Sequence, residues 1–230
     1  IFIVIYIMLK ISNYLFLSIP LLLITGPFLS DLALSLIVIF FLIDVFRNKR
    51  FEFFQNKFFY FFFIFYIYIV LNSLFQNQNF DSLKISIGYF RFGIFTLAVI
   101  HIINNNNQIL KKLNYVFLII FTVLIVDGFI QFFYGQNILG YPLSIGPRVS
   151  SLFNDELILG SYISRLFPIF FGLIIFLDKE INKVQYIFSC SIFILAEVLI
   201  YLSGERIAFF YMNLAAIFTL IAIKNFKKLR

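Results

Sequence analysis

Long apolar stretches, separated by short polar ones, are the feature that most limits how this chain can fold. The stretch at 58–75, for example, reads FFYFFFIFYIYIVLNSLF and contains no charged residue. A helix of this length spans most of the roughly 30 Å of hydrocarbon in a bilayer. Hydrophobic residues make up 62% of the 230 positions and charged residues only 13%, so a soluble domain could not bury this much apolar surface. The sequence therefore predicts an all-α fold, a polytopic transmembrane helical bundle.

About eight such stretches are predicted to be membrane-spanning helices of a single transmembrane domain, residues 8–230. The first stretch lacks a small-residue cleavage site, so it is predicted to remain in the protein as a helix. Met8 is the expected initiator, which would place residues 1–7 upstream of the natural start. The predicted spans are about 13–29, 31–46, 58–75, 84–103, 115–133, 157–177, 184–202 and 206–223.

Lysine and arginine are unevenly distributed between the two ends of these spans. Cytoplasmic loops of membrane proteins are enriched in both residues, so the basic ends are predicted to be cytoplasmic. Both termini of the chain are basic and are therefore predicted to be cytoplasmic. Residues 134–156 would then form the main loop on the outer side. The net charge of +7 is thus interpreted as orientation charge, and no nucleic acid is expected as a partner. The basic set comprises Lys10, Arg47, Lys49, Arg50, Lys57, Lys111, Lys112, Lys179, Lys183, Lys224, Lys227, Lys228 and Arg230.

Four arginines are not explained by orientation, because they lie inside the spans or at their outer ends. Lysine suffices for an orientation charge, whereas the planar guanidinium group offers a fork of donors suited to phosphate oxygens. The choice of arginine therefore indicates a chemical role. These residues are Arg91, Arg148, Arg165 and Arg206.

Ionisable residues from four consecutive spans are predicted to lie about 8–12 Å below the outer surface, at a rise of 1.5 Å per residue: Arg91, Asp127, Arg165 and Glu197. Gln131 lies one turn above Asp127 on the same helix face. Two interpretations remain open. The residues form salt bridges that only fix helix packing, such as Arg165 with Glu197 and Arg91 with Asp127, or they mark a functional site. Their gathering beneath the outer loop favours a site.

The other singular residues favour simpler interpretations. His101 lies at the cytoplasmic end of its span and is predicted to be interfacial, and Asp44 lies beside the inner basic cluster. Cys190 is the single cysteine, so no disulfide or cysteine metal cluster is expected. No GxxxxGK[ST], HExxH or DxD motif occurs, so no metal ion or soluble nucleotide is expected as a cofactor.

Four blocks of the sequence resemble the superfamily of O-antigen ligases and O-antigen polymerases. They are KISIGYFRFGIFTLAVI at 84–100, DGFIQFFYGQNILGYP at 127–142, RVSSLFNDELILGSYISRLFP at 148–168 and LSGERIAFFYMN at 202–213. The resemblance covers most of residues 8–223. It implies a metal-independent glycosyltransferase of the bacterial inner membrane, working on the periplasmic side in surface polysaccharide or lipopolysaccharide biosynthesis. Family members continue through further spans and a large periplasmic loop, so the resemblance also implies that this chain is a fragment.

The resemblance implies partners and residue roles as well. The donor would be a glycan on undecaprenyl pyrophosphate, and the acceptor would be another lipid-linked molecule. Membrane lipid would surround both. The pyrophosphate would be held by Arg91, Arg148, Arg165 and Arg206.

Attack by an acceptor hydroxyl requires a base, and the acids expected at the outer face are Asp155, Glu156 and Glu205. Asp127, Gln131, Glu197 and Tyr162 are supporting candidates. The alternatives are a transporter or flippase for a lipid-linked or anionic substrate, and a non-catalytic assembly subunit. The sequence does not distinguish a ligase from a polymerase, and it does not indicate the oligomeric state.

Overall fold

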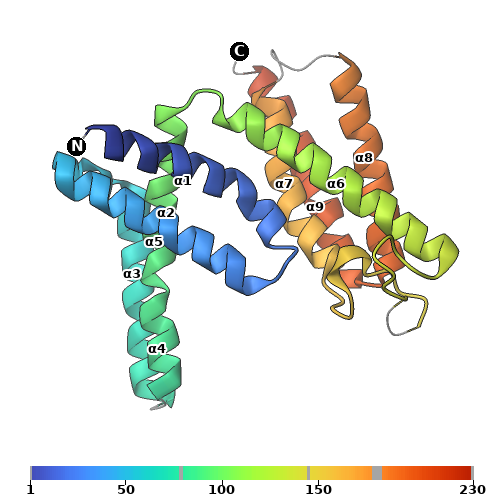
Figure 1. Cartoon of the computed structure of the whole chain (residues 1–230), viewed down its shortest axis with the longest axis horizontal. Helices are drawn as coiled ribbons and strands as arrows, with labels where there is room; N and C mark the ends of the chain where they lie inside the picture. The colour runs from blue at the N-terminus through green and yellow to red at the C-terminus, as the bar shows by residue number, and fades with distance from the viewer. Residues whose placement is uncertain (1, 78–79, 144–145, 178–182, 229–230) are drawn as a thin grey trace. The chain divides into compact units, whose positions relative to one another are not determined.

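The computed structural model describes residues 2–77, 80–143, 146–177 and 183–228, and these residues form helices without a β-strand (Figure 1). The predicted all-α fold is confirmed. The chain divides into two compact units, residues 1–109 and 110–230, and each is described by itself.

Unit 1 is built around helix α2, which contacts both α1 and α5. The helices are α1 (Phe2–Leu22), α2 (Pro27–Asn48), α3 (Lys57–Asn72), α4 (Phe80–Gly88) and α5 (Phe90–Asn105), with the short helical turns η1 (Phe51–Gln55) and η2 (Ser73–Asn77). Every fourth residue of α2 is buried, which gives the stripe Ala33, Ile37, Phe41 and Val45. Such spacing aligns side chains on one helix face, and this face forms the core of unit 1.

Unit 2 has a core of closely packed aromatic rings from two helices. It contains α6 (Ile109–Tyr134), the turn η3 (Ser151–Phe153), α7 (Leu159–Phe176), α8 (Lys183–Ser203) and α9 (Arg206–Lys228). Phe121 of α6 lies 5.0 Å from Phe167 and 5.6 Å from Phe170 of α7, measured between ring centroids. All three rings are fully buried. The segment between α6 and α7 is the predicted outer loop.

Five helical segments of the described chain are long and apolar enough to cross a membrane: Pro27–Asn48, Lys57–Phe75, Phe80–Asn105, Ile109–Tyr134 and Leu159–Phe176. Three shorter apolar helices are Ile7–Leu22, Ile187–Ser203 and Arg206–Thr219. The count of eight spans, the single transmembrane domain and the cytoplasmic position of both termini stay predictions.

The first helix lies earlier in the chain than the predicted span 13–29. α1 ends at Leu22, and α2 begins at Pro27. Gly26 has a φ of 116°, a backbone conformation that favours glycine, and proline is well accommodated in the first helical turn. The apolar stretch therefore continues through a turn that hydrophobicity alone does not reveal.

A methyl group at Gly128 is expected to destabilise unit 2. A Cβ atom there would lie 2.5 Å from Cδ1 of Leu199, whose side chain is fully buried on α8. We expect Gly128→Ala to cost about 1–3 kcal/mol of unfolding free energy through overpacking. Gly172→Ala on α7 is the matched control, because no atom lies within 4 Å of a Cβ placed there. Thermal unfolding in detergent should show a lower midpoint for Gly128→Ala only; equal midpoints would contradict this packing.

Candidate functional site

The carboxylate of Asp127 anchors the outer loop onto α6. Its side chain is fully buried. Oδ2 accepts hydrogen bonds from Ser151 Oγ at 2.7 Å and from Asn137 Nδ2 at 3.3 Å, and Oδ1 accepts one from the backbone N–H of Ile138 at 3.0 Å. These donors come from both ends of the loop, so Asp127 determines how the loop folds back onto its helix.

Gln131 completes this anchor one turn further along α6. Its Oε1 accepts hydrogen bonds from the backbone N–H groups of Ser150 and Ser151, at 2.9 and 2.7 Å. Its Nε2 donates to the carbonyl oxygens of Tyr141 and Pro142, at 3.3 and 2.9 Å. Gln131 is also fully buried, and every polar atom of its side chain has a partner in the loop. Asp127 and Gln131 are thus supporting residues in a structural sense, since their side chains hold the loop.

Glu205 joins the first turn of α7 to the start of α9. Its Oε1 accepts a hydrogen bond from the N–H of Gly160 at 2.6 Å, and its Oε2 accepts from the N–H and the hydroxyl of Ser161, at 2.9 and 2.5 Å. The first N–H groups of a helix have no partner within the helix, and a carboxylate is stabilised there by the helix dipole. Gly160 permits this approach, because a Cβ atom would lie 3.0 Å from Oε1 of Glu205.

Glu205→Ala should therefore destabilise unit 2 by about 1–3 kcal/mol, the usual cost of leaving partly buried donors without an acceptor. Glu156→Ala is the control, because Glu156 is an exposed acid just before α7. The measurement is the unfolding midpoint of each variant in detergent. A Glu205 variant as stable as the Glu156 variant would argue against a capping role.

Two of the candidate arginines, Arg148 and Arg206, lie next to Glu205 and the residues it contacts at the start of α7. The N–H of Val149 donates to the carbonyl oxygen of Leu202 at 3.2 Å, which ties the loop to the end of α8. The exposed side chain of Arg148 lies against Gly204, where a Cβ atom would be 2.9 Å from its Nε. Arg206 is exposed and is the first residue of α9.

Arg165 lies in an open groove between α7 and α9. Apart from the hydroxyl groups of Ser164 and Tyr211, the remaining lining is apolar: Pro168, Leu214, Ala215 and Phe218. Arg165 is exposed, and no side chain in the described part of the chain pairs with its guanidinium group. At 1.5 Å per residue, Arg165 lies about 6–8 Å along α7 from the turn that Glu205 caps. Three arginines of unit 2 thus lie on or next to the first turns of α7 and α9.

Glu197 does not pair with Arg165. Its Oε2 accepts a hydrogen bond from Nδ2 of Asn213 on α9, at 3.2 Å, and its Oε1 is buried without a hydrogen bond. The interpretation of Arg165 and Glu197 as a structural salt bridge is therefore not supported. Tyr162 is buried on α7, with its ring 5.3 Å from that of Phe153 in the loop. Asp155 and Glu156 are exposed in the turn that precedes α7.

Arg91 belongs to unit 1 and has its own partner there. Its Nη2 lies 2.8 Å from Oδ2 of Asp31 on α2, and both side chains are partly exposed. Its guanidinium carbon lies 5.1 Å from the ring centre of Phe92. The sequence interpretation overlooked Asp31, although an acid at the start of a predicted span is a signal that could have indicated the pair.

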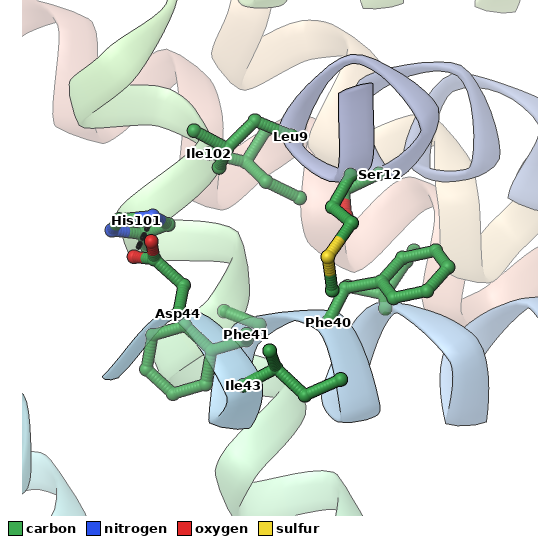
Figure 2. A pocket seen from close by; sticks show the side chains of 11 residues that line it. Leu9, Ser12, Phe40, Phe41, Ile43, Asp44, His101 and Ile102 are labelled. Atoms are coloured by element: carbon green, nitrogen blue, oxygen red, sulfur yellow. Dashed lines mark ion pairs between the residues drawn. The ribbon is translucent and has the colours of Figure 1, made fainter. Parts of the chain in front are cut away.

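Unit 1 contains a second polar cluster, which the sequence interpretation missed. Nε2 of His101 on α5 lies 3.2 Å from Oδ2 of Asp44 on α2, beside a small cavity (Figure 2). The exposed fractions of His101 and Asp44 are 2% and 5%. The ring of His101 is covered by Phe41 of α2 and Phe53 of η1, and its position at the membrane interface stays a prediction.

Among the residues that the structure describes, no three His, Cys, Asp or Glu side chains gather in a way that could hold a metal ion. No protein-family model, no curated protein and no solved structure matches this chain.

Proposed function

We propose that unit 2 binds the pyrophosphate of a lipid-linked glycan donor, and that the chain takes part in transferring the glycan to a lipid-linked acceptor. This is the activity that the resemblance to O-antigen ligases and polymerases implies, on the periplasmic side of the bacterial inner membrane. The observation that carries the proposal is the groove of Arg165. There a guanidinium group that has no partner among the described side chains lies beside apolar residues of α7 and α9. A phosphate headgroup with a hydrocarbon tail has the same combination of properties.

The charges near the groove suit such a headgroup. Arg148 and Arg206 are exposed beside the first turns of α7 and α9. The N-terminus of α9 carries partial positive charge and favours an anion, whereas that of α7 is already occupied by the carboxylate of Glu205. A lipid pyrophosphate bears about two to three negative charges, and guanidinium groups that neutralise it make it a better leaving group. Arginine can thus supply the charge stabilisation that a metal ion supplies in other phosphate sites.

A base for the acceptor hydroxyl would have to come from an acid with a free oxygen. Both carboxylate oxygens of Glu205 already accept hydrogen bonds, three in all, so Glu205 is the least suitable of the three residues to act as the base. Asp155 and Glu156 are exposed at the start of α7 and remain candidates for this role.

The test is glycan transfer in membranes that contain the full chain, a glycan on undecaprenyl pyrophosphate and a lipid-linked acceptor. We expect transfer to persist with a chelator and to fall by about 10²-fold or more in the variant Arg148→Gln/Arg206→Gln, because charge-assisted hydrogen bonds contribute roughly 1.5–3 kcal/mol each. Arg47→Gln, an exposed arginine of unit 1, is the control and should leave transfer unchanged.

Two other outcomes would favour the alternatives. Donor binding without transfer, at normal membrane abundance, would favour a transporter, a flippase or a non-catalytic assembly subunit. Unchanged transfer in the Arg148→Gln/Arg206→Gln variant would remove these arginines from the site.

A further inference from the structure

We propose that Gly204 is a positioning residue of the lipid pyrophosphate site, because its bare α-carbon seats the side chain of Arg148. This role depends on the proposed function of unit 2, which it extends to the residue that holds an arginine in place before a lipid arrives. Gly204 lies between the end of α8 at Ser203 and the start of α9 at Arg206. Arg148 comes from the loop between α6 and α7.

The stem of the Arg148 side chain lies across the face of Gly204. A Cβ atom on Gly204 would lie 2.9, 3.2 and 3.4 Å from Nε, Cδ and Cγ of Arg148. Three consecutive atoms of the stem thus occupy the space that any other side chain would need. A residue larger than glycine would therefore displace the stem.

The backbone that follows Arg148 is held in place as well. The N–H of Val149, a fully buried residue, donates to the carbonyl oxygen of Leu202 at 3.2 Å. The N–H of Ser150 donates to Oε1 of Gln131 at 2.9 Å. Both residues after Arg148 are thus attached to the helices of unit 2, and what remains to be positioned is its side chain.

A simpler explanation for Gly204 is its place after a helix, where glycine is common for a conformational reason alone. Its φ is 73°, in the left-handed region, and its N–H donates to the carbonyl oxygen of Tyr201 at 3.1 Å. Gly135 has the same place after α6, with a φ of 77° and its N–H donating to the carbonyl oxygen of Gln131 at 2.9 Å. Apart from the adjoining residues, nothing in the described part of the chain lies within 4 Å of a Cβ placed on Gly135. The two glycines differ in the contact with Arg148, so a comparison of them separates the two explanations.

The seated guanidinium group keeps its charge available for a ligand. The side chain of Arg148 is exposed, and no carboxylate of the described residues forms an ion pair with it. Glu205, the acid next to Gly204, directs both of its carboxylate oxygens to N–H groups of α7. Arginine has high rotamer entropy, and a side chain that is already ordered loses less of it when an anion binds. The seat should therefore raise the affinity for a pyrophosphate that Gly204 itself does not contact.

The seat is tested first without a lipid, by NMR of the full chain in detergent with ¹⁵N-labelled arginine. The Nε–H signal of Arg148 is identified by its absence from Arg148→Ala. Its heteronuclear nuclear Overhauser effect should be that of an ordered group in the wild type and in Gly135→Ala, and that of a mobile side chain in Gly204→Ala. A mobile signal in the wild type, or an ordered one in Gly204→Ala, would overturn the seat. The wild-type signal decides alone if Gly204→Ala does not fold.

The second measurement is binding of undecaprenyl pyrophosphate to the purified chain by native mass spectrometry, with undecaprenol as the lipid without the pyrophosphate. Gly204→Ala should weaken pyrophosphate binding by about threefold to tenfold, the usual cost of ordering one long side chain, and leave undecaprenol binding unchanged. Gly135→Ala should leave the binding of both lipids unchanged. An equal loss for both lipids in Gly204→Ala would indicate general damage to unit 2 and would contradict a positioning role.

A double variant shows whether Gly204 acts through Arg148. Once Arg148→Ala has removed the stem, Gly204→Ala should cause no further loss of pyrophosphate binding. The same loss in both backgrounds would show that the turn itself matters, and would overturn the positioning role. If the wild type binds the two lipids equally while its Arg148 signal is ordered, the proposed function fails and the positioning role fails with it, whereas the seat itself stands.

Discussion

Arg165→Ala is expected to reduce glycan transfer by about 10²–10³-fold, the usual effect of removing one donor that stabilises developing charge. Membrane abundance should stay normal, because the guanidinium group is exposed and has no partner among the described side chains that its loss would leave unpaired. Arg165→Lys should be nearly as damaging, since lysine keeps the charge but loses the planar fork of donors. The measurement is transfer at equal membrane abundance, and wild-type transfer by the lysine variant would contradict a role as a phosphate fork.

Glu197 offers a second control for Arg165. If the two residues were a structural pair, neutralising both would be less harmful than neutralising one. Glu197 instead accepts a hydrogen bond from Asn213, so Glu197→Gln should not restore transfer to Arg165→Ala. Recovery of transfer in the double variant would return Arg165 to a packing role.

Asp127→Ala is expected to destabilise unit 2 by about 3–5 kcal/mol, because three buried or partly buried donors would lose their acceptor at once. The donors are the hydroxyl of Ser151, the amide of Asn137 and the N–H of Ile138. The outer loop should then separate from α6 and become accessible to proteases. Asp155→Ala is the matched control, as Asp155 is an exposed acid in the segment between α6 and α7.

Two measurements check this prediction. The unfolding midpoint in detergent should fall steeply for Asp127→Ala and hardly change for Asp155→Ala. Limited proteolysis should cut residues 135–153 faster in the Asp127 variant. Equal midpoints and equal cleavage rates would show that the buried hydrogen bonds do not hold the loop.

The helices could be predicted from the sequence, because apolar stretches of membrane-spanning length have few alternatives to a helix. The ends of the helices were less predictable. The predicted first span ran through Gly26 and Pro27, where a backbone conformation, not a change in hydrophobicity, ends one helix and starts the next. The same limit applies wherever an apolar stretch contains a turn.

The partners of the polar residues could be predicted only in part. The sequence placed Asp127 and Gln131 on one face of a helix, as the structure does. Their partners lie in a loop without periodicity, so the hydrogen bonds to Ser150 and Ser151 could not be deduced from spacing.

The pairs of ionisable residues between the helices of unit 1 could not be predicted from the sequence either. Arg91 pairs with Asp31, and His101 with Asp44, because the rotation of α5 about its axis turns both side chains toward α2. A depth estimate from helical rise contains no information about that rotation.

The most direct test of the lipid pyrophosphate site is binding of undecaprenyl pyrophosphate to the purified chain, measured by native mass spectrometry beside undecaprenol, which has the same tail without the pyrophosphate. The wild type should prefer the pyrophosphate by at least about tenfold, since one charge-assisted hydrogen bond contributes roughly 1.5 kcal/mol. Arg165→Lys should lose most of that preference, and Arg47→Gln should keep it. Equal binding of the two lipids by the wild type would contradict the account.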